Sequence, residues 1–145
     1  MTPFSRRARG RLWGVLAWKD LDALFAAMLA KRGWHAWMLG EPPPAAPVAA
    51  DALGPMLADL GALLRREHRE DYCGIVYADD LADPTLVKVY DPGNLGSSCS
   101  HGAPGEHPPR WIFSLDRPEP LESHDPAPGG RLRWWHRLTG RAPAP

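Results

Sequence analysis

The chain has 145 residues, the usual length of one domain, and its 17 basic and 17 acidic side chains leave no formal net charge. No stretch approaches the roughly 18 to 20 apolar residues that cross a bilayer, and two cysteines are too few for a disulfide framework. These features exclude a membrane-spanning protein and a disulfide-stapled secreted domain. Together with a bacterial-type composition rich in arginine, alanine and proline, they lead us to expect a cytoplasmic protein without a Cys73–Cys99 disulfide.

The charge is distributed unevenly along the chain. Residues 1–19 carry five basic side chains and no acid, and residues 129–145 carry four basic side chains and no acid, whereas all 17 acids lie in 20–128. The two basic ends therefore either pack back on an acidic body or reach an anionic partner. We expect three parts: a basic Trp/Arg segment over 1–19, one α+β domain over 20–116, and a proline-rich, basic tail over 117–145.

An amphipathic helix is predicted to begin after Asp20, which suits an N-cap, and to end at Gly33, which suits the residue after a helix. Its apolar residues recur at helical spacing and form one face: Leu21, Leu24, Phe25, Met28 and Leu29. The next six residues, WHAWML at 34–39, are aromatic and bounded by glycines. They favour a buried strand over an extended packing segment.

A proline-rich linker is predicted over 41–50, EPPPAAPVAA, because each proline disfavours a helix at the residue before it. A second helix is predicted from Asp51, with Pro55 in the first turn, where proline is tolerated. Its apolar stripe comprises Leu53, Met56, Leu57, Leu60, Leu63 and Leu64.

Three segments rich in β-branched and aromatic residues are predicted as strands: 73–78, 85–90 and 110–115. The acidic turn between the first two contains Asp79, Asp80 and Asp83; its spacing favours a solvated hairpin turn over a magnesium or calcium loop. The predicted fold is α+β, with two N-terminal amphipathic helices packed on a small antiparallel sheet. The sheet is a three-stranded meander, with 34–39 as an optional fourth strand, and the termini are flexible or docking.

The loop over 91–109 is long for a compact domain, and such loops are usually functional or disordered. Its first four residues, DPGN, predict a tight turn. Cys99, His101 and His107 are of the type that zinc or iron prefers, and Cys73 offers a fourth ligand. Neither CxxC nor HxxxH occurs in the chain, however. The alternatives are a metal site, a Cys99 nucleophile beside His101, and a surface connection.

Seven tryptophans are many for this length, and four of them lie in the two basic ends. Tryptophan and arginine outside a core are typical of protein interfaces, and also of membrane-surface segments. The expected partner-binding residues are Trp13, Trp18, Arg131, Arg133, Trp134 and Trp135.

We therefore expect a small non-catalytic accessory or adaptor protein, without a cofactor, that binds a partner protein through its ends and the 91–109 loop. One alternative is a metal- or thiol-dependent protein that uses the Cys99 loop with zinc or iron. Another is a peripheral protein held on an anionic membrane surface. The acidic body argues against a general nucleic-acid binder, and the oligomeric state stays open.

Overall fold

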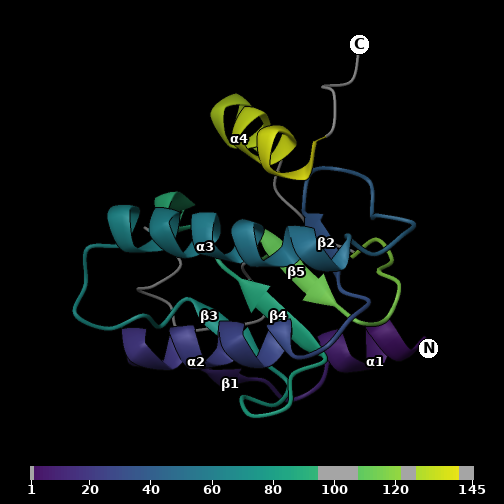
Figure 1. Cartoon of the computed structure of the whole chain (residues 1–145), viewed down its shortest axis with the longest axis horizontal. Coiled ribbons are helices and arrows are strands. Elements are labelled where there is room, and N and C mark those ends of the chain that lie inside the picture. The colour runs from purple at the N-terminus through teal and green to yellow at the C-terminus, as the bar shows by residue number, and fades with distance from the viewer. Residues whose placement is uncertain (1, 95–107, 122–126, 141–145) are drawn as a thin grey trace.

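The computed structural model of the chain describes residues 2–94, 108–121 and 127–140 (Figure 1). Within these ranges four helices and five strands follow one another, so the α+β class is confirmed. In chain order they are α1 (Pro3–Ala8), β1 (Trp13–Gly14), α2 (Trp18–Leu29), β2 (His35–Met38), α3 (Ala50–Glu67), β3 (Val76–Ala78), β4 (Leu86–Val89), β5 (Trp111–Ser114) and α4 (Gly129–Thr139). A short 3-10 turn at Pro92–Asn94 follows β4, where the sequence predicts a tight turn.

The strands form one antiparallel sheet in the order β1-β3-β4-β5-β2. Its centre is the consecutive set β3, β4 and β5, and β2 joins at one edge by pairing with β5, from His35 opposite Ser114 to Met38 opposite Trp111. At the other edge β1 pairs with β3, with Trp13 opposite Ala78. The sheet therefore has five strands rather than the expected three or four, because residues of the basic N-terminal segment supply one of them.

One face of the sheet is covered by α2 and α3, which lie across it (Figure 1). Alternate strand residues point to this face, as the two-residue period of a strand requires, and they include Val87 and Val89 in β4. The predicted stripe of α3 is buried throughout. On α2 the stripe is buried except for Leu29, whose place in the last turn leaves it 49% exposed.

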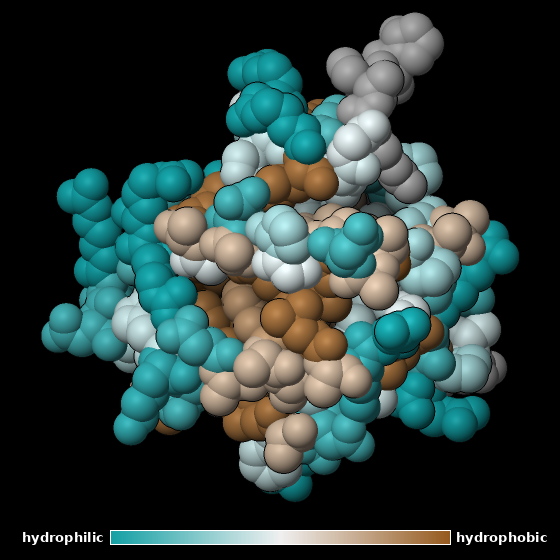
Figure 2. Space-filling view, viewed as in Figure 1, coloured by the Kyte–Doolittle hydropathy of each residue, from teal (hydrophilic) through white to brown (hydrophobic). Residues whose placement is uncertain are grey.

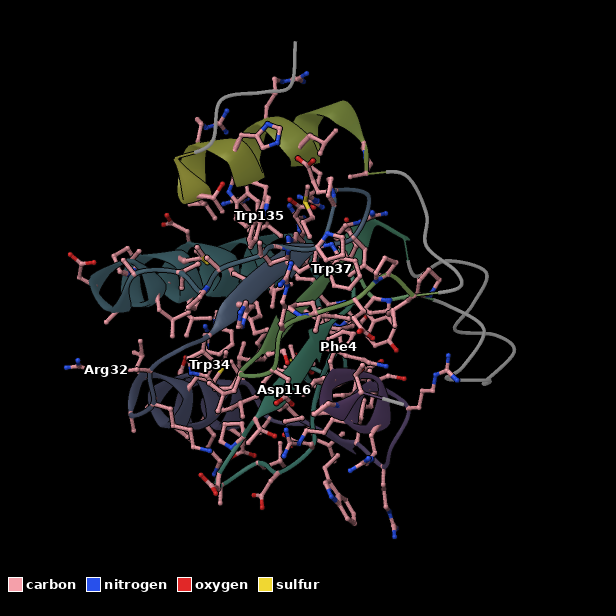
Figure 3. All side chains as sticks on the ribbon, turned by 90° about the vertical axis from the view of Figure 1, so that its right-hand side faces the viewer. Phe4, Arg32, Trp34, Trp37, Asp116 and Trp135 are labelled. Atoms are coloured by element: carbon pink, nitrogen blue, oxygen red, sulfur yellow. The ribbon has the colours of Figure 1, made fainter. Side chains whose placement is uncertain are left out.

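The opposite face carries a second apolar cluster, in which Phe4 and Ala8 of α1 pack against side chains of β2, β4 and β5. The rings of Phe4 and Trp37 lie 6.2 Å apart between centroids (Figure 3). Both ends of this short helix are capped by side chains. At the N-terminal end the Thr2 hydroxyl accepts a hydrogen bond from the Ser5 N–H, and at the C-terminal end Lys88 Nζ donates to the Ala8 carbonyl over 2.7 Å. Burial lowers the pKa of Lys88.

The C-terminal helix α4 adds a further layer above α3 and inserts Trp135, 2% exposed, into the main core (Figure 1). Trp134 lies beside it and contacts Trp111, with ring centroids 5.8 Å apart. The chain before α4 passes close to the turn after β2. There, a side chain on Gly40 (φ +106°) would lie 2.8 Å from the Ala127 nitrogen. The described parts of both termini are thus folded onto the body as helices.

Candidate functional site

The predicted metal site rests mainly on Cys99, His101 and His107, which lie outside the described residues. Cys73, its fourth member, is a free thiol buried at the start of the β3 region, with no exposed surface. Burial raises the pKa of this thiol, and hydrogen bonds with the backbone of Ile75 and Val76 oppose the rise only in part. Within the described ranges no three metal-ligating side chains come together. Cys73 therefore packs as a small apolar residue.

The two ends of the 91–109 loop are joined by a buried ion pair. Asp91 follows β4 and Arg110 precedes β5, and because these strands are neighbours their side chains meet, with Nε 3.7 Å from Oδ2. The guanidinium of Arg110 also donates to the Leu39 carbonyl over 2.8 Å. Asp91 in turn accepts a hydrogen bond from the Gly93 N–H and so shapes the turn that opens the loop.

Arg131 of α4 completes this ionic cluster from above. Its guanidinium donates to both oxygens of Asp91, over 3.0 and 2.8 Å, and to both oxygens of Glu67 on α3, over 3.1 and 2.8 Å. Its carbon Cζ also lies 5.7 Å from the centre of the Trp111 ring. The hydrogen bond from Arg131 lowers the pKa of Glu67, and the same bond raises the pKa of Arg131.

The C-terminal members of the expected partner-binding set are thus largely engaged within the protein. Trp135 is buried, Trp134 is half-buried on Trp111, and Arg131 is held by two carboxylates, while Arg133 is exposed. Figure 3 shows Trp135 pointing from α4 into the body. A hydrogen bond between the His136 ring and the Glu41 carboxylate holds the second half of the helix.

The N-terminal members lie differently. Trp13 is 48% exposed, and the Arg11 guanidinium stands over its ring, with Cζ 4.5 Å from the centroid. Trp18 is half-buried at the start of α2, where its indole N–H donates to the Glu70 carbonyl over 3.0 Å. A second cation, Arg65, lies 5.3 Å from the Trp18 ring. Arginine over an indole face is a favourable electrostatic contact.

Two further exposed apolar residues lie beside these tryptophans. Leu16 is 68% exposed and Tyr72 is 55% exposed, and their chain segments are joined by a 2.6 Å hydrogen bond from the Cys73 N–H to the Leu16 carbonyl. The His68 ring links the group, with its centroid 6.1 Å from both the Trp18 and Tyr72 rings. We call this group the β1 rim; its members are Arg11, Trp13, Leu16, Trp18, Arg65, His68 and Tyr72. The sequence did not indicate Leu16 as a surface residue, because it belongs to no helical or strand-like pattern of apolar residues.

The acidic hairpin turn between β3 and β4 is a structural turn. Asp79 accepts hydrogen bonds from the backbone N–H groups of Asp80, Thr85 and Leu86, and from the Thr85 hydroxyl. Asp83 forms an ion pair with Lys31. These carboxylates therefore close the turn, as expected for a turn rather than for a cation loop.

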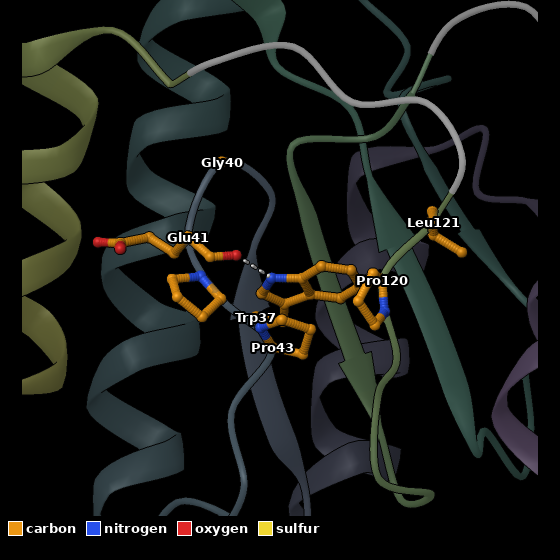
Figure 4. A pocket seen from close by; sticks show the side chains of 7 residues that line it. Trp37, Gly40, Glu41, Pro43, Pro120 and Leu121 are labelled. Carbon is orange, nitrogen blue, oxygen red and sulfur yellow. Dashed lines mark hydrogen bonds between the residues drawn. The ribbon is translucent and has the colours of Figure 1, made fainter.

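Two other surface features are less informative. A hollow of about 290 Å³ is lined by Trp37, Gly40, Glu41, Pro42, Pro43, Pro120 and Leu121 (Figure 4). The indole N–H of Trp37 is already bonded to the Glu41 carbonyl over 2.9 Å, and the lining has no pair of groups for acid–base chemistry. Apolar side chains also gather between α2 and α3 (Figure 2), where Leu29 contacts the Gly54 position.

No helix in the described ranges has the length and apolar character needed to cross a membrane. No model of a known protein family matches the chain, and neither does any curated protein or any solved structure.

Proposed function

We propose that this protein is a small, cytoplasmic, non-catalytic accessory protein that binds a partner protein through the β1 rim. The single observation that supports the proposal is the exposure of Trp13, Leu16 and Tyr72, at 48%, 68% and 55%: Trp13 lies in β1, Leu16 follows that strand closely, and the Cys73 N–H joins the Tyr72 segment to the Leu16 carbonyl. Large exposed apolar side chains that gather in one place are typical of interaction sites, whereas scattered ones are ordinary. The arginines beside them belong to the residue types that anchor protein interfaces.

The tryptophans of the C-terminal helix are weaker candidates for direct contact. Trp135 fills the core and Trp134 packs on Trp111, so their replacement would disturb the fold before it disturbed an interface. Trp13 and Leu16 can be changed at little structural cost, because both are exposed and surface substitutions usually alter stability by about 0.5 kcal/mol or less.

The test is co-purification of the tagged full chain from its native cells, with partners identified by mass spectrometry after crosslinking. We expect one partner to be lost when Leu16 is changed to serine or Trp13 to alanine. The matched control is Leu29→Ser, since Leu29 is a leucine of comparable exposure on the seam between α2 and α3, away from the rim. A partner that both rim variants retain, or that Leu29→Ser loses equally, would show that the rim is not the binding surface.

A further inference from the structure

The two edges of the sheet differ in what covers them. At one edge β2 is buried along its whole length, and the Val48 N–H at the end of the proline-rich linker donates to the Trp34 carbonyl over 2.8 Å. At the other edge β1 is the first strand in the order of the sheet and has β3 as its neighbour on one side. Figure 1 shows β1 at the lower border of the sheet, below β3. Because Trp13 and Leu16 are exposed there, this is the edge at which a further strand can be added.

The backbone of this edge presents one donor and one acceptor to the outside. The Val15 N–H donates to the Val76 carbonyl over 2.8 Å, and the Val15 carbonyl accepts from the Gly74 N–H over 2.8 Å, so both polar groups of Val15 point into the sheet. Because the C=O and N–H of a planar trans peptide point in opposite directions, the Gly14 carbonyl and the Leu16 N–H point outward. Among the residues that the structure describes, no hydrogen bond satisfies the Leu16 N–H.

We infer that a second copy of this chain pairs antiparallel with β1 about a two-fold axis at Val15, which joins two five-stranded sheets edge to edge. The inference rests on the proposed function and names the partner at the rim. An outward acceptor and an outward donor on either side of one residue are self-complementary in an antiparallel pair. With Val15 opposite its own copy, each Leu16 N–H meets the Gly14 carbonyl of the other chain. The same contact forms twice, as a two-fold interface requires.

In this register each exposed leucine lies opposite a glycine. Leu16 of one copy meets Gly14 of the other, and the space above Gly14 holds the Tyr77 ring: a Cβ added at Gly14 would lie 3.0 Å from Tyr77 Cε2. Residues opposite each other in neighbouring strands share a face, as do residues two apart in one strand, so the leucine and the tyrosine ring lie on the same face. Each Leu16, which is 68% exposed in the single chain, therefore packs on a tyrosine ring of the other copy.

Trp13 also lies opposite a small residue. Its counterpart in the second copy is Ala17, whose backbone is extended (φ −88°, ψ 142°). Helix α2 begins at the next residue, Trp18, so the pairing stops there and does not set Lys19 opposite Arg11. Both large exposed side chains of the edge thus find a small residue across the axis.

The charges around the edge are compatible with a second copy. Exposed side chains of both signs flank each end of β1: Arg11 and Asp80 near Trp13, and Arg69, Glu70 and Asp71 near Tyr72. A segment of a single charge sign would meet like charges at both ends. An antiparallel second copy sets the Trp13 end of one chain against the Tyr72 end of the other, so each end meets both signs. The outward backbone pair in turn favours a peptide partner over a lipid or a nucleic acid, because main-chain hydrogen bonds join added strands.

The direct test is the mass of the full chain in solution, measured by sedimentation equilibrium from low micromolar to near-millimolar concentration. We expect a reversible shift toward twice the monomer mass. The Leu16 amide signal should move with concentration in heteronuclear NMR spectra. A monomer at every concentration, or concentration-dependent shifts confined to amides outside β1 and its flanks, would overturn the inference.

A pair of variants isolates the backbone contribution. Leu16→Ala keeps the outward N–H and removes the side chain, whereas Leu16→Pro removes both. The bond occurs twice in the dimer and each is worth about fivefold in affinity, so we expect Leu16→Pro to dimerise on the order of 25-fold more weakly than Leu16→Ala. Equal dimerisation of the two folded variants would refute strand pairing.

Circular dichroism checks that both variants fold. Should the proline variant unfold, Ala17→Arg must weaken dimerisation for the inference to stand, because it sets a bulky cation against Trp13 and Arg11 of the other copy. The matched control is Ala30→Arg, an exposed alanine at the far end of α2, which should dimerise like the wild type.

The same measurements separate this inference from the proposed function. A chain that stays monomeric, while Trp13→Ala loses a different cellular protein, would leave the rim as a binding surface and refute the second copy. A dimer that neither Leu16→Pro nor Ala17→Arg weakens would have its interface elsewhere and would also refute the inference alone. A monomeric chain whose rim variants keep every cellular partner, or whose rim binds only anionic lipid vesicles or single-stranded RNA, would refute both.

Discussion

Asp91 Oδ2 lies 3.7 Å from Arg110 Nε, and this pair joins the two ends of the 91–109 loop. Both side chains are nearly inaccessible, at 6% and 4% exposure. Arg131 binds the same carboxylate from α4 and continues to Glu67 on α3. The base of the loop, the C-terminal helix and the second long helix are therefore held by one cluster of charges. Because Asp91 and Arg110 at the centre of the cluster are buried, the loss of a partner of Asp91 is costly.

The first prediction concerns Arg131. Its replacement by alanine leaves Asp91 with a weaker set of partners in a buried setting, so we expect a loss of about 3 kcal/mol in the free energy of unfolding. Urea denaturation followed by tryptophan fluorescence measures this change. The matched control is Arg133→Ala, since Arg133 is exposed on the same helix, and its effect should stay within about 0.5 kcal/mol. Similar effects of the two variants would argue against a stabilising cluster.

The second prediction distinguishes core tryptophans from rim tryptophans. Trp135 is 2% exposed, and truncation of a buried tryptophan to alanine typically costs about 3 to 5 kcal/mol. Trp13 is 48% exposed, so Trp13→Ala should cost about 1 kcal/mol or less, chiefly the contact with Arg11. Thermal and urea unfolding of both variants decide the point. Comparable losses would mean that Trp13 is part of the core.

The third prediction concerns acid sensitivity. Burial tends to raise the pKa of Asp79, but hydrogen bonds from Thr85, Leu86 and Asp80 outweigh it and hold that pKa below its ordinary value of 3.8. Because the pKa of Asp79 is lower in the folded than in the unfolded protein, its ionised carboxylate stabilises the folded state at pH values above the unfolded-state pKa. This stabilisation is lost as the pH falls through the folded-state pKa. Asp79→Asn should therefore lower the free energy of unfolding at pH 7 by about 1 to 2 kcal/mol. The difference in free energy of unfolding between this variant and the wild type should become smaller below about pH 4.

The control for that experiment is Asp59→Asn, because Asp59 is an exposed acid on α3. Its stability should run parallel to that of the wild type across the same pH series. If the difference in free energy of unfolding between Asp79→Asn and the wild type stayed constant down to pH 2, the ionisation of Asp79 would not contribute to stability.

The fourth prediction concerns the thiol of Cys73. Cys73 has no exposed surface, and burial raises its pKa, so both access and thiolate formation are suppressed. In a Cys99→Ser background, we expect the remaining thiol to react with Ellman's reagent in urea and to stay unreactive in buffer at pH 8. Prompt reaction of the native protein would mean that the β3 region opens readily.

Several elements of this fold could be predicted from local patterns. The helical period of the apolar residues identifies α2 and α3, and β-branched and aromatic runs identify β3, β4 and β5. These patterns are readable because each element buries one face in the same core. The boundaries differ from the expected ones by a few residues: α2 begins at Trp18, before the expected cap at Asp20.

Three elements could not be predicted in this way. β1 has two residues, and it is a strand only because Ala78 and Tyr77, far away in sequence, lie opposite it. α1 has six residues and is stabilised by Phe4 packing on the far side of the sheet. α4 is rich in arginine, and its helical form is supported by the burial of Trp135 and by the carboxylates that bind Arg131. Each of these three elements is stabilised by residues that are far from it in the sequence.

The sequence by itself determined the α+β class, the two long helices and the concentration of tryptophan and arginine in the two basic ends. Only the tertiary structure decided how those ends are used: Trp135 of α4 is buried in the core, whereas Trp13 of β1 stays at the surface. The physical reason is that tryptophan and arginine suit a core, a buried ion pair and an interface equally well. Which role each residue takes depends on the groups brought beside it by strand pairing and helix docking.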